Sequence, residues 1–362
     1  MKPKLTFLGI SVVLALLIAT LLPANPTLAA KPDRDAGQSQ ITILSEAKDQ
    51  NRNSTIDEVW SSGWINLTPG DTTILIHNLG GDVEDYAIQM WFMDTDAGGY
   101  GIHNRAYGGL EDNGLYQGAI WRGLTANNIR VTRNLDDTLA DGIRVWIWPS
   151  EPILQYCSTW TAIGQGDVVT VNHNVGGNVD DYVVGLWFRD PVAGIHQMYY
   201  GGVEDGGNLY GAYWQNLDAS QVQVARYPDD PYAAEFRLCV STTDPPDWDS
   251  GWVDISPDET KTLLHNLGGS VTRYIVRTEF KSLPNDGAPE APMAIHQFAY
   301  GGDASNVLAK DVQYLGANWQ NLTGASIDVY RWADDTYADQ VRVRIWQRVV
   351  SVYLPIVVKN YL

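Results

Sequence analysis

The chain has 362 residues, and its formal net charge at neutral pH is -19. A surface this acidic repels phosphate backbones, so the composition argues against a nucleic-acid partner. The chain contains 14 Trp, 19 Tyr and 34 Gly, a composition typical of β-strands joined by tight turns.

The first 30 residues have the features of a secretory signal. Lys2 and Lys4 precede an apolar run from Leu5 to Leu22, and small residues follow up to Ala30. An uncleaved anchor is the alternative, because the run is just long enough to span a bilayer. We predict a mature protein that is secreted, extracellular or at the cell surface, with no membrane span.

A polar segment, residues 31–56, separates this signal from the rest of the chain. Its composition predicts a linker, and its one apolar run, "ITIL", is long enough for an added strand. The C-terminal segment, residues 348–362, is an apolar tail that is too short to cross a membrane and is interrupted by Pro355. We expect this tail to add an edge strand.

One sequence module recurs three times between these end segments. The corresponding tryptophans Trp64, Trp160 and Trp252 are 96 and then 92 residues apart. This repetition predicts three copies of one folding unit. We place the modules at residues 57–150, 154–243 and 246–347.

Apolar and polar residues alternate within each module, as in "VRVRI" at residues 341–345. A period of two indicates half-buried strands, and turn signals at regular intervals are typical of sandwiches. We therefore predict an all-β chain of three tandem antiparallel β-sandwich modules of about 90 residues each. The joints between modules are short, and they permit a pseudo-trimer and a linear array equally.

The only two cysteines, Cys157 and Cys239, lie in the first and last predicted strands of the second module. In an oxidising compartment this placement predicts a disulfide, with two buried free thiols as the alternative. A disulfide closing so long a loop stabilises a module by about 4 kcal/mol on the chain-entropy model.

All six histidines occupy two positions of the module. His77, His173 and His265 stand in "HNLGG" or "HNVGG", a sequence that predicts a turn. The second set stands in "GIHNRAYGG", "GIHQMYYGG" and "AIHQFAYGG". The spacing between the two sets fits no zinc signature. We expect backbone hydrogen bonds from the first set, and we leave metal binding open.

Two features of the module are candidate recognition surfaces. If residues 102–107 are extended, His103, Arg105 and Tyr107 share one face of a strand. The centre of this face changes from Arg to Met to Phe among the modules, which suits a packed strand or binding surfaces of different selectivity. The second feature is an acidic hairpin that follows an arginine in every module. The candidate ligand-binding residues are His103, Arg105, Tyr107, Asp136, Asp137, His196, Tyr200, Asp229, Asp230, His296, Tyr300, Asp334 and Asp335.

The acidic hairpins have two interpretations. Aspartate at a hairpin tip is ordinary turn chemistry, and the arginines would then neutralise it. A pair of carboxylates also accepts hydrogen bonds from sugar hydroxyls or coordinates calcium. We predict no cofactor, with calcium left open.

Signatures of enzymes are mostly missing, since the sequence has no GxSxG, P-loop or GxGxxG after a strand. A glycosidase needs only two suitably placed carboxylates, so a glycoside hydrolase stays a third hypothesis. A catalytic site is rarely repeated three times with different polar residues in each copy. Repeated binding modules, in contrast, gain avidity, so the repeat favours binding over catalysis.

The order of elements in each module is "SGW", "HNLGG", "DYxV", "GAxW" and a last strand such as "VRVRIW". This order resembles the H-type lectin fold, and the "HNLG" element is also similar to sandwich domains of phage tail fibres. The lectin resemblance implies small sandwiches that trimerise and bind N-acetylgalactosamine-like sugars between protomers. It further implies an intramolecular pseudo-trimer with the His103, Arg105 face and the Asp136, Asp137 loop near a module boundary.

The chain departs from the lectins where their loop should carry a sugar-contacting aromatic and a histidine, because it has Asp-Asp there. Our first hypothesis is a secreted, non-catalytic protein that binds glycans or cell-surface polymers through repeated modules. The second is a structural or adhesive surface protein without a small ligand.

Overall fold

The structure is a computed structural model, and it describes residues 41–45, 60–112, 115–149, 154–205, 208–242, 245–283, 293–305 and 313–347. The predicted signal (1–30), most of the linker and the C-terminal tail (348–362) lie outside the described residues. The expected edge strand in the tail is therefore a prediction still.

The described chain consists of strands and short 3-10 turns, which confirms the all-β fold class. In the first module one sheet has the order β2-β10-β4-β5, and β3, β9 and β8 form the second. The apolar run of the linker forms β1, which extends the second sheet by pairing parallel to β3. The bounds are β1 (Ile41–Ser45), β2 (Trp60–Ser61), β3 (Thr72–Ile76), β4 (Tyr86–Asp94), β5 (Gly101–His103), β6 (Leu110–Asp112), β7 (Leu115–Gln117), β8 (Ala119–Arg122), β9 (Asn128–Arg133) and β10 (Gly142–Pro149).

The second module repeats this arrangement. Its sheets have the orders β11-β20-β14-β15, with β12 also paired to β20, and β13-β19-β18. The bounds are β11 (Leu154–Cys157), β12 (Thr161–Ala162), β13 (Val168–Asn172), β14 (Tyr182–Asp190), β15 (Gly194–His196), β16 (Val203–Asp205), β17 (Asn208–Tyr210), β18 (Ala212–Gln215), β19 (Gln221–Arg226) and β20 (Glu235–Thr242).

The third module has the sheets β21-β30-β24-β25, with β22 also paired to β30, and β23-β29-β28. The bounds are β21 (Trp248–Asp249), β22 (Val253–Asp254), β23 (Thr260–Leu264), β24 (Tyr274–Lys281), β25 (Ile295–His296), β26 (Asp303–Ser305), β27 (Gln313–Leu315), β28 (Ala317–Gln320), β29 (Ser326–Arg331) and β30 (Gln340–Gln347).

The alternation seen in the sequence places one face of each strand in the core. In the third module Ile327 and Val329 of one sheet and Val341, Val343 and Ile345 of the other are fully buried. The sheets thus pack as a sandwich around the residues that the period of two selects.

A 3-10 turn leads into the long central strand of each module, at η2 (Val83–Asp85), η3 (Val179–Asp181) and η4 (Val271–Arg273). The preceding residue, Asp82, Asn178 or Ser270, caps the turn by accepting a backbone N–H two residues later. No helix in the described ranges has the length and apolar character to cross a membrane.

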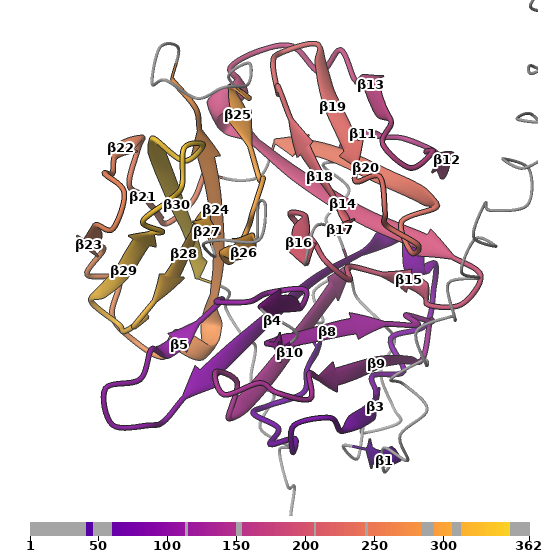
Figure 1. The fold of residues 1–362 in the computed structure, drawn as a ribbon, viewed down its shortest axis with the longest axis vertical. Helices are drawn as coiled ribbons and strands as arrows, with labels where there is room; N and C mark the ends of the chain where they lie inside the picture. The colour runs from indigo at the N-terminus through magenta and orange to yellow at the C-terminus, as the bar shows by residue number, and fades with distance from the viewer. Residues whose placement is uncertain are drawn as a thin grey trace, which may run out of the picture. The chain divides into compact units, whose positions relative to one another are not determined.

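Backbone hydrogen bonds join the modules pairwise, and the third pair closes a ring (Figure 1). The region of β15 bonds to the end of β8, that of β25 to the end of β18, and that of β5 to the end of β28. Representative bonds are Gly123 N to Ala193 O (2.9 Å), Asn216 N to Met293 O (2.9 Å) and Asn321 N to Tyr100 O (2.8 Å). Because the first module bonds to the third, the chain is an intramolecular pseudo-trimer and not a linear array.

The turns after the second set of histidines meet at the centre of this ring. Ala106 N donates to Gly301 O, Tyr199 N to Gly108 O, and Ala299 N to Gly201 O, at 2.7–3.0 Å. Gly108 has a φ of +81°, and a Cβ there would lie 2.8 Å from the backbone nitrogen of Tyr200. Glycine is required because another module's backbone approaches this closely.

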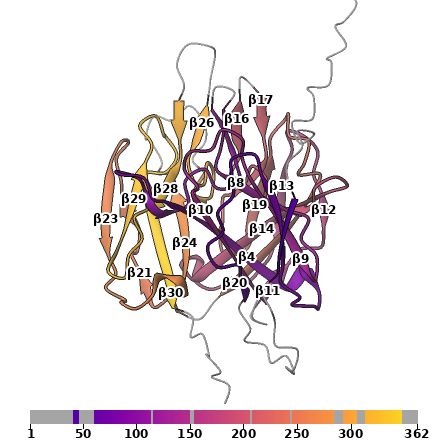
Figure 2. The ribbon, with the colours of Figure 1, turned by 90° about the horizontal axis from the view of Figure 1, so that it is seen from below.

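The short hairpins β6–β7, β16–β17 and β26–β27 gather at one end of the ring. Strands β6, β16 and β26 contact one another pairwise, and Figure 2 shows β16, β17 and β26 together. Each module thus contributes one hairpin beside the common centre.

Candidate functional site

The first set of histidines binds the backbone, as the turn motif predicts. Nδ1 of His77, His173 and His265 accepts the N–H two residues later, at 3.2–3.3 Å. The rings also pack against the aromatic residue that begins the central strand, such as Tyr86 beside His77. These histidines stabilise the "HNLGG" turn.

The second set, His103, His196 and His296, is fully buried. Nδ1 of each accepts a backbone N–H two residues later, at 3.1 Å. Nε2 lies 2.7, 3.1 and 2.9 Å from the carbonyl oxygens of Leu139, Tyr232 and Tyr337. Since Nδ1 accepts, the proton is on Nε2 and the rings are neutral. Their part in ligand binding stays a prediction.

Residues 102–107 are not extended throughout, so the condition for a shared strand face is not met. Strand β5 ends at His103, and Ala106 has a φ of 53°. The chain turns there because Ala106 bonds to the third module and Tyr107 forms a bridge with Ala119. His103, Arg105 and Tyr107 therefore do not share one strand face.

The inner aspartate of each acidic hairpin, Asp137, Asp230 or Asp335, is buried in an ion pair. Asp137 Oδ2 lies 2.7 Å from Nε of Arg133, whose Nη1 donates to the carbonyl of Leu67. The same carboxylate accepts the backbone N–H groups of Gly118 and Ala140. Arg226–Asp230 and Arg331–Asp335 repeat this pair at 2.9 and 2.7 Å. These contacts match the structural interpretation of the hairpins.

The outer aspartates are more accessible. Asp229 and Asp334 are exposed and Asp136 is half-buried. One oxygen of each accepts a backbone N–H of the neighbouring hairpin, from Leu209, Tyr314 and Tyr116 respectively. Of the predicted acidic residues, these three are therefore placed where a ligand in solvent reaches them.

The boundary between the first and third modules holds a cluster that we call the seam cluster, formed by Tyr100, Arg105, Tyr314, Tyr330 and Trp332. The guanidinium carbon of Arg105 lies 3.9 Å from the ring centroid of Tyr100 and 4.5 Å from that of Trp332. Tyr314 stacks on Trp332, with ring centroids 4.8 Å apart. Arg105 thus lies at the boundary between the first and third modules.

The charge of Arg105 is unusual in its surroundings. Arg105 is only 9% exposed, and burial lowers its pKa from the ordinary value. No carboxylate forms an ion pair with it in the described parts of the chain, and its Nε is buried without a hydrogen bond. The faces of Tyr100 and Trp332 stabilise this cation instead.

The other two boundaries lack this cation. The residues equivalent to Arg105 are Met198, which packs with Ile120 of the first module, and Phe298, which packs on Tyr213 of the second. The change from Arg to Met to Phe therefore distinguishes three boundaries, of which one has an arginine at this position.

The three remaining candidates, Tyr107, Tyr200 and Tyr300, meet at the centre of the ring. Their ring centroids are 5.6–6.0 Å apart, in edge-to-face contact. Tyr107 donates to Gln197 Oε1 at 2.7 Å, and Tyr200 donates to Gln297. Tyr107 and Tyr200 are buried and Tyr300 is half-buried at the junction of the modules.

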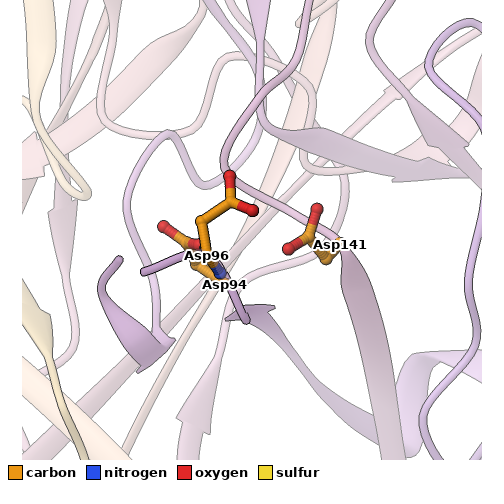
Figure 3. A group of neighbouring side chains, drawn as sticks. All are labelled: Asp94, Asp96 and Asp141. Carbon is orange, nitrogen blue, oxygen red and sulfur yellow. The ribbon is translucent and has the colours of Figure 1, made fainter. Parts of the chain in front are cut away.

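A carboxylate cluster that the sequence analysis did not single out lies in the first module. Asp94, Asp96 and Asp141 have oxygens within 4.8 Å of one another (Figure 3). Asp94 accepts hydrogen bonds from the backbone N–H groups of Asp96 and Tyr100. Asp141 accepts hydrogen bonds from the backbone N–H and the hydroxyl of Thr95. Oxygen ligands of this kind suit calcium. These hydrogen bonds also account for the cluster as part of a turn.

The module repeat shows that this cluster is specific to the first module. The equivalents of Asp94 and Asp141 are Asp190 and Ala234 in the second module, and Ser282 and Asp339 in the third. Only the first module therefore brings both carboxylates together.

A scan against protein-family models and a search among curated proteins find no match for this chain. The lectin-like function stays a proposal that depends on the site itself.

Sequence reasoning missed the aromatic part of the seam cluster. Tyr100 lies in the loop before the second histidine, and Trp332 lies beside the acidic hairpin of the third module, 232 residues away in sequence. A usable signal was present, since the position of Trp332 holds Asn134 and Tyr227 in the other modules. The change to Trp332 points to a site beside Arg105 only once it is known that the first and third modules meet.

Proposed function

We propose that this protein is a secreted, non-catalytic carbohydrate-binding protein, and that the seam cluster contacts the glycan. The observation that carries the proposal is the nearly buried guanidinium of Arg105, without a carboxylate partner, between aromatic rings of two modules. The N-terminal apolar run and the Cys157–Cys239 disulfide support secretion.

The cluster has the chemistry that sugars require. Tyr100, Tyr330 and Trp332 are half-buried, so part of each residue remains accessible to solvent. Aromatic faces pack against the C–H faces of sugar rings, and a guanidinium donates several hydrogen bonds to hydroxyl or carboxylate oxygens. A planar cation without an ion pair favours glycans that carry a carboxylate.

An exposed carboxylate adds an acceptor at the edge of the cluster. Asp334 Oδ2 accepts the backbone N–H of Tyr314, whose ring stacks on Trp332. It lies two residues from Trp332, where it can accept hydrogen bonds from sugar hydroxyls. Arg105 and Asp334 are two of the residues that the sequence nominates, and they come from different modules.

A glycan array followed by calorimetry on the best ligand tests the proposal. The variant R105M gives the first module the residue that the second has at this position, Met198, so packing is kept while the charge is lost. We expect R105M and D334A to weaken binding at least tenfold. Arg130, an exposed arginine of β9, provides the matched control, and R130M should bind like the wild type.

Unchanged affinity of R105M and D334A would overturn the assignment to the seam cluster. If no glycan binds at all, the structural or adhesive hypothesis replaces carbohydrate binding. Turnover of a chromogenic glycoside by the purified protein would favour the hydrolase hypothesis.

A further inference from the structure

A small cavity lies at the centre of the ring, beside the three tyrosines. Its volume is about 30 Å³, which is room for about two water-sized particles. Side chains of all three modules line it, including Gln89, Trp91, Trp187 and Arg277. A space of this size suits a small ion better than a sugar.

The three modules place different residues at equivalent positions of the cavity wall. The central strands β4, β14 and β24 contribute Gln89, Gly185 and Arg277. Gly185 leaves space that the ring of Trp187 partly fills, since a Cβ there would meet that ring at 2.6 Å. The pseudo-symmetry is therefore broken, and one wall carries a cation.

A second difference among the modules concerns the residue that follows the buried histidine, which is a glutamine in two modules and an asparagine in the first. Gln197 and Gln297 donate to the carbonyl oxygens of Leu186 and Thr278, at 2.6 and 2.9 Å. Their equivalent is Asn104, which is one methylene shorter. Asn104 lies close to Tyr300, but its Nδ2 makes no hydrogen bond of standard geometry.

The indole N–H of Trp91 is likewise buried without a partner. Asn104 and Trp91 are 2% and 1% exposed, and both line the cavity. Trp91 thus provides a free donor beside the cation, and the Asn104 amide interacts with the Tyr300 hydroxyl.

The charge of Arg277 has no counterion in the described wall. Arg277 is half-buried, and none of the residues that line the cavity is acidic. The nearest acid along β24, Glu279, forms its ion pair with Arg344 at 2.5 Å, and its electrostatic interaction with Arg277 is weaker. The three tyrosines cannot supply the missing negative charge, because burial raises the pKa of their hydroxyls and thereby favours the neutral form.

We propose that this cavity binds one small monovalent anion of halide size, held by the guanidinium of Arg277. A charge that is partly withdrawn from water is stabilised by an opposite charge or by well-placed hydrogen bonds, and the cavity offers room for such an ion but holds no carboxylate. The free indole N–H of Trp91 and the amide of Asn104 complete its surroundings. The anion bridges the three modules at their common centre, independently of glycan binding at the seam cluster.

Thermal unfolding of the full chain tests the proposal, with chloride exchanged for gluconate at constant ionic strength. A ligand that binds only the folded state raises the unfolding temperature with its concentration. We expect a saturable rise for the wild type, a reduced rise for R277K and none for R277Q. Arg273, an exposed arginine of η4, gives the control R273Q, which should respond like the wild type.

Crystals of the wild-type protein grown with bromide give a second, direct measurement. We expect an anomalous peak beside Arg277, even if R277Q proves unable to fold. The proposal is overturned if no peak lies there, or if R277Q responds to chloride as the wild type does.

Discussion

Single polar side chains that recur in all modules are mostly engaged with the backbone. The six histidines accept N–H groups two residues away, and the inner aspartates accept several N–H groups and one arginine. A buried polar group costs free energy unless it is paired. Recurrence in this chain therefore reflects the requirements of the fold at each turn.

Burial of the second histidines makes the stability depend on pH. Loss of hydration lowers the pKa of His103 and of His296 from 6.5 to about 4, although carbonyl hydrogen bonds oppose this shift. Between pH 6.5 and 4 the unfolded chain binds protons that the folded chain does not, so stability falls as the pH is lowered. Across this window each histidine should lower the free energy of unfolding by on the order of 3 kcal/mol.

Urea unfolding at pH 7.5, 5.5 and 4.5 measures this effect. For His103 the neighbouring groups are Arg105, Asp94 and Asp141. Carboxylates of ordinary pKa titrate near the lower end of the window, so the change from pH 7.5 to 5.5 reports mainly on the histidines. The double variant H103N/H296N should show a weaker pH dependence than the wild type. A free energy of unfolding that stays constant from pH 7.5 to 5.5 would contradict the prediction.

One cross-strand position at the edge of the sheet carries a different pair of residues in each module. Cys157 of β11 lies opposite Cys239 of β20, and the two form the predicted disulfide. At this position the first module has Ser61 opposite Trp146, and the third has Asp249 opposite Arg344. The disulfide thus replaces noncovalent pairs that the other modules use between the same strands.

Loss of the disulfide should destabilise the second module. The bond joins residues 82 apart, and removing a loop constraint of this length costs about 4 kcal/mol on the chain-entropy model. We expect the C157S/C239A variant to unfold at lower urea concentration than the wild type. Reductant should shift the wild type toward the variant and leave the variant unchanged. Equal midpoints without reductant would show that the bond adds no stability.

At the scale of the whole molecule, each module depends on its neighbours. Tyr200 and Met198 of the second module are 6% and 5% exposed because the adjacent modules cover them. The backbone bonds of Tyr199 and Ala299 at the centre also require a partner module. We therefore expect the three modules to unfold as one cooperative unit.

The second module alone, residues 154–243, should not be a folded monomer. Its central turn would expose apolar rings and unpaired N–H groups, which cost free energy in a small sandwich. We expect self-association, with three copies replacing the natural ring, or an unfolded chain. Light scattering with circular dichroism distinguishes these states, and a folded monomer would contradict the prediction.

The sequence by itself determined the all-β class, the threefold repeat, the added strand near Ile41–Ser45 and the Cys157–Cys239 bond. These features follow from local patterns, namely alternation, turn residues and the positions of two cysteines in one repeat. The central turns were not predictable, because Ala106 adopts its left-handed φ where its N–H meets Gly301 of another module.

Tertiary structure alone decided which candidate residues meet. Arg105 gains its aromatic neighbours from the third module, and Arg277 faces tyrosines of all three. Such contacts depend on how the modules are arranged, and a repeat with short joints is compatible with both a ring and a linear array. Periodicity selects the buried face of a strand, but it carries no information about the partner on the other side.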